Sequence, residues 1–222
     1  LLKIFLRSNY LGNLGDLMYK FSRVLRCETL DNAYLKLTSH FDDPTKIVLK
    51  SRKKETRLSN YNSELEQFDN QQKMMIFDAL TYLPDDILVK VDRASMANSL
   101  EIRTPFLDHR VVEYSWKIPQ SLKFKDSKGK WILRQILNKY VPKKIIERPK
   151  MGFGVPIDTW LRGELRDWAE SLLNETRLKN DGYFDHKHIK KIWNEHLYKK
   201  KNWQYHLWDI LMFQSWLDKE KN

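Results

Sequence analysis

Apolar residues recur at steps of three and four along most of the chain, which is the spacing of amphipathic helices. Near the start this spacing is followed by Leu11, Leu14, Leu17, Met18, Phe21, Val24 and Leu25. A first helix is expected there, and Asp31 is expected to begin a second, shorter one. Between Phe41 and Gln67 the one apolar run is residues 47–49, so this charged stretch is predicted to be mostly loop with short helix.

Prolines and capping residues divide the middle of the chain. A helix from Gln71 to Leu83 is predicted to end at Pro84, and Asp85 is predicted to cap the next helix, which runs to about Ser99.

Further along, Asp108 is predicted to cap a helix that reaches Trp116 and precedes Pro119. A helix is expected over 129–140. The stretch 141–156 holds three prolines and two glycines, which predicts an ordered loop.

The C-terminal third is predicted to form three packed helices, over residues 158–174, 185–199 and 203–219. Six tryptophans of this region are expected to be buried or half-buried anchors: Trp160, Trp168, Trp193, Trp203, Trp208 and Trp216.

The composition also favours helices, because glycine and proline are few, with seven each among 222 residues. An all-α fold is therefore expected. The formal net charge of +11 suits an anionic partner such as nucleic acid, a membrane surface or a phosphorylated small molecule, and it equally suits a plain basic surface. Charge alone does not choose among these.

A single cysteine, Cys27, excludes an internal disulfide framework and a thiolate zinc site, and it favours a reducing compartment, the cytoplasm. Its helical apolar surroundings indicate a packed thiol rather than a nucleophile. The chain has no run of about 18 uncharged apolar residues, so no transmembrane helix is expected. It opens at Leu1 without a signal-peptide pattern, which suggests a fragment or a processed piece.

Asp86 and Lys90 are the first candidates for chemistry, because a spacing of four places both on one face of the predicted helix. An ordinary surface ion pair is the plain interpretation. In SLEIRTPFLDHR, Arg103 is expected to form a fork of hydrogen bonds to Glu101, Asp108 or Asp92, either locking the junction or also shaping the wall of a cleft.

Lys150 lies just ahead of the glycines of MGFG, between two prolines, on a loop that can approach a ligand closely through Gly152. A cation in this position suits a phosphate-bearing substrate. The order of residues differs from that of a Walker loop, and a lysine near glycines is common in loops.

Three motifs in order resemble the synthetase domain of glutamine-dependent asparagine synthetases, over roughly residues 77–168: YLPDDILVKVDRASMANSLEIRTPFLDHR, GKWILR and KKIIERPKMGFGVPIDTWLRGELR. The resemblance implies that residues 1–222 are the C-terminal helical part of that domain, which has an α/β, pyrophosphate-loop (PP-loop) fold of the adenine-nucleotide-hydrolase type. The family's SGG-D-S loop and its GDG-DE motif are absent from this chain, and so is the glutaminase domain.

The family's reaction is the ATP-dependent amidation of aspartate through an aspartyl adenylate, with ammonia derived from glutamine and with Mg²⁺ accompanying ATP. The resemblance implies this activity for the intact protein. The segment alone is expected to bind no ATP productively and to be inactive. A homodimer is left open, and no nucleic acid or membrane is expected as a partner.

The resemblance assigns a catalytic role to Lys150, which matches the lysine that stabilises negative charge on the phosphates and the departing pyrophosphate. Asp86, Lys90 and Gly152 match residues that line the cleft. Glu101, Arg103 and Asp108 match residues that hold the cleft-lining residues in position without contacting the substrate.

Two other functions remain open at this stage. A related amidotransferase would use the same activation on another carboxylate, such as a sugar acid, a peptide or a β-amino acid that closes to a lactam. A basic helical module that binds nucleic acid or protein would explain the net charge without catalysis.

Overall fold

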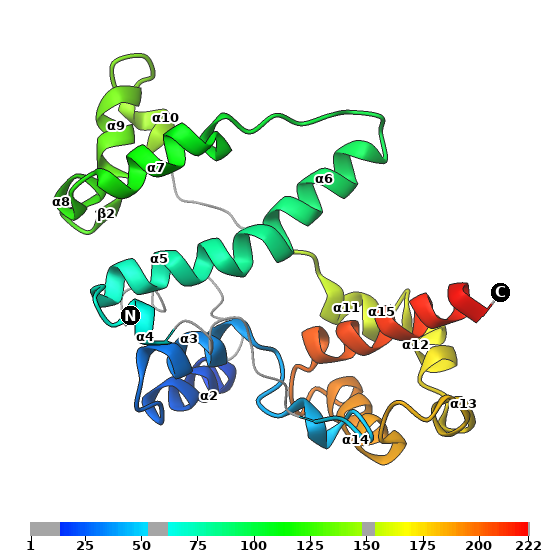
Figure 1. Cartoon of the computed structure of the whole chain (residues 1–222). Helices are drawn as coiled ribbons and strands as arrows, with labels where there is room; N and C mark the ends of the chain where they lie inside the picture. The colour runs from blue at the N-terminus through cyan, green and yellow to red at the C-terminus, as the bar shows by residue number, and fades with distance from the viewer. Residues whose placement is uncertain (1–13, 53–61, 148–153, 222) are drawn as a thin grey trace. The chain divides into compact units, whose positions relative to one another are not determined.

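The structure is a computed structural model that describes residues 14–52, 62–147 and 154–221 (Figure 1). The chain divides into two compact units. The first unit combines residues 1–82 with residues 155–222, and the second unit is residues 83–154.

Two of the N-terminal helices of the first unit begin at polar side-chain caps. Thr29 accepts a hydrogen bond from the backbone of α3, and Asp69 forms a capping box with Gln72 at the start of α5. The helices are α2 (Leu14–Leu25), α3 (Leu30–Thr38), α4 (Asn62–Leu65) and α5 (Asn70–Leu80). The predicted first two helices are confirmed, with α3 beginning one residue before Asp31.

A small core joins these helices. Tyr34, Leu65 and Phe77 are buried together, with the rings of Tyr34 and Phe77 5.1 Å apart. The hydroxyl of Tyr34 donates to Asp78 at 2.8 Å and lies 3.0 Å from the hydroxyl of Thr81. Burial raises the pKa of this phenol. The thiol of Cys27, at the end of α2, donates to the carbonyl of Arg23, which agrees with a packed rather than a reactive cysteine.

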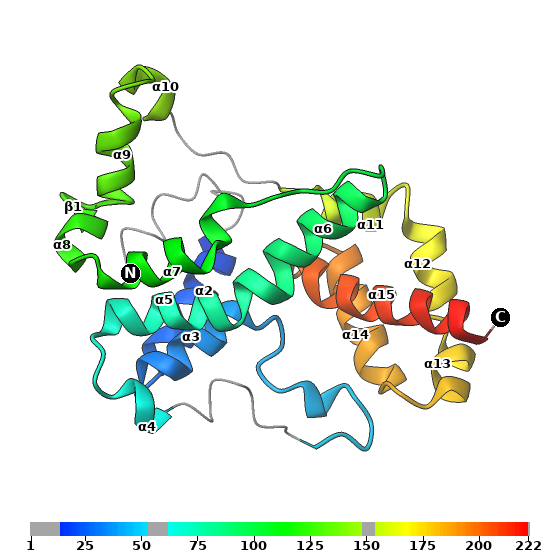
Figure 2. The ribbon, with the colours of Figure 1, turned by 45° about the horizontal axis from the view of Figure 1, so that its top comes forward.

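The C-terminal helices of the first unit pack around one long helix. That helix is α15 (Gln204–Lys221), and it contacts α11 (Ile157–Arg162), α12 (Arg166–Leu172) and α14 (His186–Leu197). A further helix, α13 (Glu175–Asp181), packs on α14. Figure 2 shows α14 and α15 side by side.

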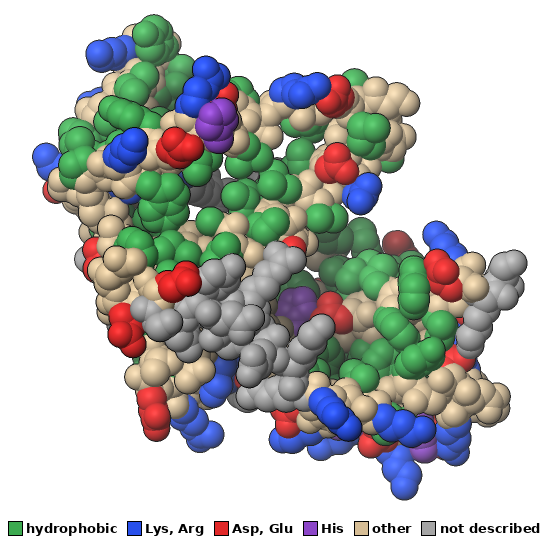
Figure 3. Space-filling model, in the orientation of Figure 1, with side chains coloured by type: hydrophobic (Ala, Val, Ile, Leu, Met, Phe, Trp, Pro, Cys, Tyr) green, Lys and Arg blue, Asp and Glu red, His purple; other side chains and the backbone are tan. Residues whose placement is uncertain are grey.

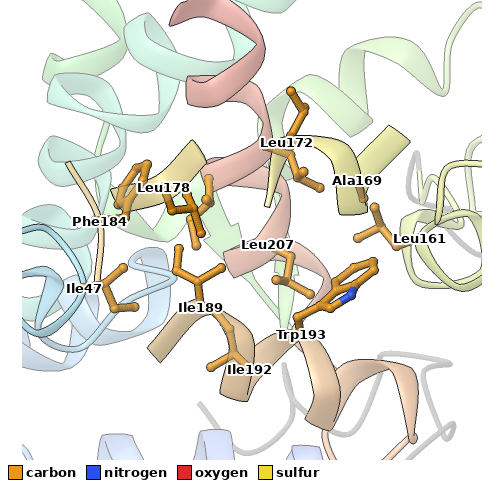
Figure 4. Close-up of a cluster of buried hydrophobic side chains, with 12 residues drawn as sticks. Ile47, Leu161, Ala169, Leu172, Leu178, Phe184, Ile189, Ile192, Trp193 and Leu207 are labelled. Carbon is orange, nitrogen blue, oxygen red and sulfur yellow. The ribbon is translucent and has the colours of Figure 1, made fainter. Parts of the chain in front are cut away.

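Their shared core contains Leu161, Leu178, Ile189, Trp193 and Leu207, all buried (Figure 4). The segment after α3 adds to this core through Ile47, which follows the 3₁₀ turn η1 (Pro44–Lys46). Val48 forms an antiparallel bridge with Phe184, and the amide of Leu49 donates to the carbonyl of Tyr183 at 2.8 Å. Residues far apart in the sequence are thereby fixed in one core.

A buried polar clamp holds α11 against α14. Arg162 donates through Nε to the carbonyl of His196 at 2.8 Å and through Nη1 to Asp158 at 2.9 Å. Nδ1 of His196 accepts the backbone N–H of Trp203 at 3.2 Å, so the neutral ring carries its proton on Nε2. His196 is fully buried, and this burial lowers its pKa to about 4.

The second unit is helical with one small hairpin. Its helices are the π-helical turn η3 (Leu83–Leu88), α6 (Val89–Met96), the 3₁₀ turn η4 (Pro105–Leu107), α7 (His109–Lys117), α8 (Gln120–Lys123), α9 (Trp131–Leu137) and α10 (Lys143–Ile146). The hairpin pairs β1 (Phe124–Lys125) with β2 (Lys128–Gly129). Because this hairpin is the only sheet among the described residues, the expected all-α class is confirmed.

The second unit buries almost nothing. Ser95 is its only buried residue among those described, and large apolar side chains stand exposed on most of its elements. The most exposed are Tyr140, Tyr114, Phe106, Leu100, Ile145 and Met96. Figure 3 shows extensive hydrophobic surface on the face in view. Surfaces of this kind mark sites that another part of a protein, or another molecule, covers.

The predicted boundary at Pro84 is wrong. Helix α5 already ends at Leu80, with Thr81 as its C-cap. Pro84 lies inside the π-helical turn, which accommodates a residue without a backbone N–H. Asp85 also lies in this turn and caps nothing, since α6 begins after Leu88 without a side-chain cap. Helix α6 then ends at Met96, with Ala97 as its C-cap, rather than at about Ser99.

Helix 129–140 is shorter than predicted, because Gly129 is paired in the hairpin and α9 begins at Trp131. The stretch 141–156 contains the short helix α10, and its residues 148–153 lie outside the described residues. Two capped helices are confirmed: Asp108 caps α7 and Asp185 caps α14.

The predicted helix 158–174 is two helices, α11 and α12, separated at Gly163, where a Cβ would lie 3.3 Å from the carbonyl of Thr159. Helix α13 was not predicted, although Asn174 caps it and Gly182, at φ +69°, ends it. Five of the six tryptophans are buried or half-buried, whereas Trp216 is 53% exposed and is not an anchor.

Among the described residues, every helix is too short or too polar to cross a membrane.

We predict that the first unit loses stability in mild acid. Above pH 6.5 His196 is neutral whether the chain is folded or unfolded. Below that pH the unfolded chain takes up a proton that the buried ring does not accept until about pH 4. The free energy of unfolding therefore falls across this window by about 3 kcal/mol from this residue, of which about 2 kcal/mol is lost between pH 7 and pH 5. Urea unfolding at pH 7 and pH 5, followed by tryptophan fluorescence, measures the loss.

His196→Asn keeps an acceptor near the position of Nδ1 and cannot be protonated, so it should remove about half of the pH dependence. The rest comes from His206, whose pKa burial also lowers to about 4. His109→Asn, at an imidazole that is 80% exposed, is the matched control and should leave it unchanged. An equal pH dependence in all three proteins would refute the role of the buried ring.

Candidate functional site

Asp86 and Lys90 form the expected pair across the junction of η3 and α6. Nζ of Lys90 lies 3.7 Å from Oδ1 of Asp86, and the side chains are 56% and 52% exposed. A pair so exposed adds only a few tenths of a kcal/mol, as the plain interpretation holds. Both side chains therefore remain accessible to a ligand at little cost.

Arg103 takes Glu101 as its partner among the three carboxylates considered. Nη2 lies 2.6 Å from Oε1, in an extended segment where the two side chains are 84% and 68% exposed. Asp92 pairs instead with Arg93 at 3.5 Å. Because the Glu101–Arg103 pair joins residues only two apart, it stiffens its own segment and does not tie one helix to another.

Among the described candidate residues, Asp108 accepts the most hydrogen bonds. Its Oδ1 accepts the backbone N–H of Arg110 at 2.9 Å and Nε at 3.0 Å, while Oδ2 accepts Nη2 at 2.8 Å. The hydrogen bonds from the Arg110 side chain hold the pKa of this carboxyl below its usual range. The aspartate of the PFLDHR motif thus fixes the turn η4 to the start of α7.

Lys150 and Gly152 lie outside the described residues. The elements on either side of their predicted loop are described. Before it, Nζ of Lys128 donates to Glu147 at 2.7 Å and thereby lowers the pKa of that carboxyl.

After the loop comes α11, whose Leu161 is fully buried and whose Arg162 belongs to the polar clamp. The chain that leaves the loop is therefore firmly anchored in the first unit.

Each described candidate pairs with a residue no more than four positions away. Within the described residues, no hydrogen bond or ion pair joins one of these pairs to another. Across residues 14–52, 62–147 and 154–221, no group of three or more His, Cys, Asp or Glu side chains is placed to hold a metal ion.

Two polar arrangements were missed by sequence reasoning. Asp158 and Arg162 stand four apart in IDTWLR, a spacing that could have signalled their pairing, but His196 completes the clamp from 34 residues away and gave no signal. In the second unit, a pocket of about 220 Å³ is lined by charged side chains that include Lys128, Arg134 and Glu147.

Comparisons with known proteins support one family. The family model described as asparagine synthase matches residues 4–218. The chain is 34% identical over 156 residues to asparagine synthetase (glutamine-hydrolysing) 1 of Bacillus subtilis, a match that covers 70% of this chain and 24% of that protein. This chain therefore spans about a quarter of the length of that relative.

Asparagine synthetase (glutamine-hydrolysing) 3 of Bacillus subtilis is 39% identical over 82 residues, which cover 37% of this chain and 13% of that protein. A more distant relative is the amidase chyE of Penicillium rubens, 31% identical over 112 residues, which cover 47% of this chain and 17% of that protein. No solved structure matches this chain significantly.

The family model covers nearly the whole chain, and the motifs that carry the resemblance lie within the matched residues. The chain belongs to the asparagine synthase family.

Proposed function

We propose that the protein containing this segment is a glutamine-hydrolysing asparagine synthetase. The observation that carries the proposal is the family match over residues 4–218, joined to a 34% identity with a Bacillus subtilis protein of that name. In the proposed reaction the β-carboxylate of aspartate attacks the α-phosphorus of ATP, and pyrophosphate leaves. Ammonia then attacks the aspartyl carbonyl, and AMP leaves as asparagine forms.

The segment is proposed to be the C-terminal helical part of a PP-loop α/β synthetase domain. The exposed apolar side chains of the second unit support this, because a stable isolated domain would bury far more of them. The nucleotide loop and a glutaminase domain would belong to other parts of the same polypeptide. We place the enzyme in the cytoplasm, and we leave a homodimer open.

Lys150 is proposed to be the catalytic cation of this segment. As pyrophosphate leaves, negative charge gathers on its oxygens, and a fixed ammonium group in a site shielded from water stabilises that charge. The loop fits this role because glycines and prolines flank Lys150, and because α11 anchors the chain that follows. Gly152 would let the backbone approach the phosphates closely.

Asp86 and Lys90 are proposed to line the cleft, and their exposed, weak pairing leaves both able to contact a substrate. Glu101 and Arg103 would support the wall from the neighbouring segment. Asp108 would hold the segment in shape rather than contact a substrate, since its carboxylate accepts hydrogen bonds from the backbone and the side chain of Arg110.

The described residues do not offer a set of ligands for Mg²⁺. The ion would reach the proposed site with ATP and would take its protein ligands from outside these residues. The part that this segment contributes to catalysis is accordingly the cation of Lys150 and the walls around it.

We predict that Lys150→Ala in the intact enzyme lowers the rate of aspartate-dependent pyrophosphate release by about 100-fold or more, because one stabilising charge is removed from the transition state. Lys150→Arg should keep part of the activity. Lys144→Ala, an exposed lysine on α10, is the matched control and should retain normal activity. A near-normal rate for Lys150→Ala would remove this residue from the mechanism.

We also predict that residues 1–222 alone bind the dye anilinonaphthalene sulfonate with a strong rise in fluorescence, because the second unit exposes its apolar side chains. The intact enzyme should give a much smaller rise per mole, and the segment alone should release no pyrophosphate. If the segment failed to enhance the dye, its apolar surface would already be covered and the proposed division of the domain would be wrong.

A further inference from the structure

A pocket of the first unit, with a volume of about 380 Å³, lies outside the proposed catalytic segments. Its wall comes from three separate parts of the sequence: the segment around η1, the residues that follow α13, and the middle of α15. The volume lies within the range of sites that hold small molecules. None of the residues assigned to amide formation lines it.

Aromatic and aliphatic side chains form almost the whole wall. Phe213 meets Tyr183 edge to face at 5.3 Å and Phe184 at 5.2 Å, so the three rings stand at steep angles to one another. Ile47 and Phe41 complete the opposite part of the wall. Figure 4 shows Ile47 and Phe184 reaching the core from neighbouring segments, which fixes this part of the wall to the packed interior.

One charged residue, Asp209, belongs to this lining. Its side chain is 44% exposed, so the carboxylate stands where the pocket meets solvent. Oδ2 lies 2.7 Å from Nδ1 of His40, and the ring of His40 stacks on Tyr205 at 5.3 Å. These contacts hold the carboxylate in place beside the apolar wall.

The neighbouring His206 does not cancel this charge. Its ring packs edge to face against Phe41 and Trp203, each at 4.7 Å. Burial lowers the pKa of His206 to about 4, so the ring is neutral near pH 7. The pocket thus has one carboxylate in its lining, that of Asp209, which is paired with His40.

A ligand with an apolar body and a positively charged group would fit both the apolar wall and the carboxylate of Asp209. The rings favour an apolar group and attract a cation through their faces, while the fixed carboxylate favours an ammonium over a neutral or anionic group. We propose that this pocket binds a small organic ammonium ion with an aromatic or aliphatic body, the body lying against Phe213 and the ammonium reaching Asp209.

The test uses three probes that share one phenylethyl body: phenylethylammonium, phenylethanol and phenylpropionate. Each is titrated into the protein at pH 7.5, and the methyl resonances of Ile47 and Ile210, which both line the pocket, are followed by NMR. The ammonium should bind about two- to fivefold more tightly than the alcohol, as expected for a partly exposed ion pair, and the propionate most weakly.

Asp209→Asn keeps an oxygen for His40 and should make the three affinities equal. Glu220→Gln removes the same charge from the same helix about 16 Å away and should preserve the order. Tyr183→Ala, at a half-exposed ring, should weaken all three probes together. The thermal unfolding midpoint of each variant identifies any that has not folded.

The proposal is overturned if the ammonium causes no saturable shift of these methyl groups, if it binds no more tightly than the alcohol, or if Asp209→Asn leaves the preference intact. None of these outcomes bears on amide formation, which depends on other residues.

Discussion

Burial of apolar surface around α15 is the interaction on which the described structure depends. All of the buried apolar side chains among the described residues lie in the first unit, and the larger of its two cores gathers residues of α11, α12, α13 and α14 around Leu207 and Leu211. The same packing keeps water away from the hydrogen bonds of Arg162 and thereby strengthens them. The second unit has the same helical character without a comparable core, so it exposes apolar surface of the kind that marks an interaction site.

The sequence predicted features that depend on neighbouring residues alone, such as helix caps. Asp108 caps α7 as predicted, because a cap needs only a carboxylate and the next two or three amides, and Asp185 caps α14 at the predicted start of that helix. Pro84 misled the prediction, since a π-helical turn accommodates the missing N–H. The bond from His40 to Asp209 spans 169 residues, and no spacing in the sequence could have indicated it.

In the candidate site, too, short-range contacts were predicted from the sequence and long-range packing was not. The sequence predicted the pairing of Asp86 with Lys90 and one of the partners of Arg103, because those contacts lie within four residues. The surface interpretation of the Asp86–Lys90 pair is confirmed. The sequence did not predict how exposed Arg103 and Glu101 would be, since exposure depends on how distant elements pack. The family itself was recognisable from ordered motifs rather than from helical pattern, and the family model over residues 4–218 confirms it.

The central claim is that the intact enzyme activates aspartate by adenylation. Aspartate labelled with oxygen-18 in its β-carboxylate tests this most directly, with ATP and ammonia present and the products followed by phosphorus NMR. The account predicts that AMP acquires one labelled oxygen, because the bridging oxygen of the aspartyl adenylate stays with phosphorus when ammonia attacks the carbonyl. Unlabelled AMP, or release of ADP and phosphate in its place, would contradict the account.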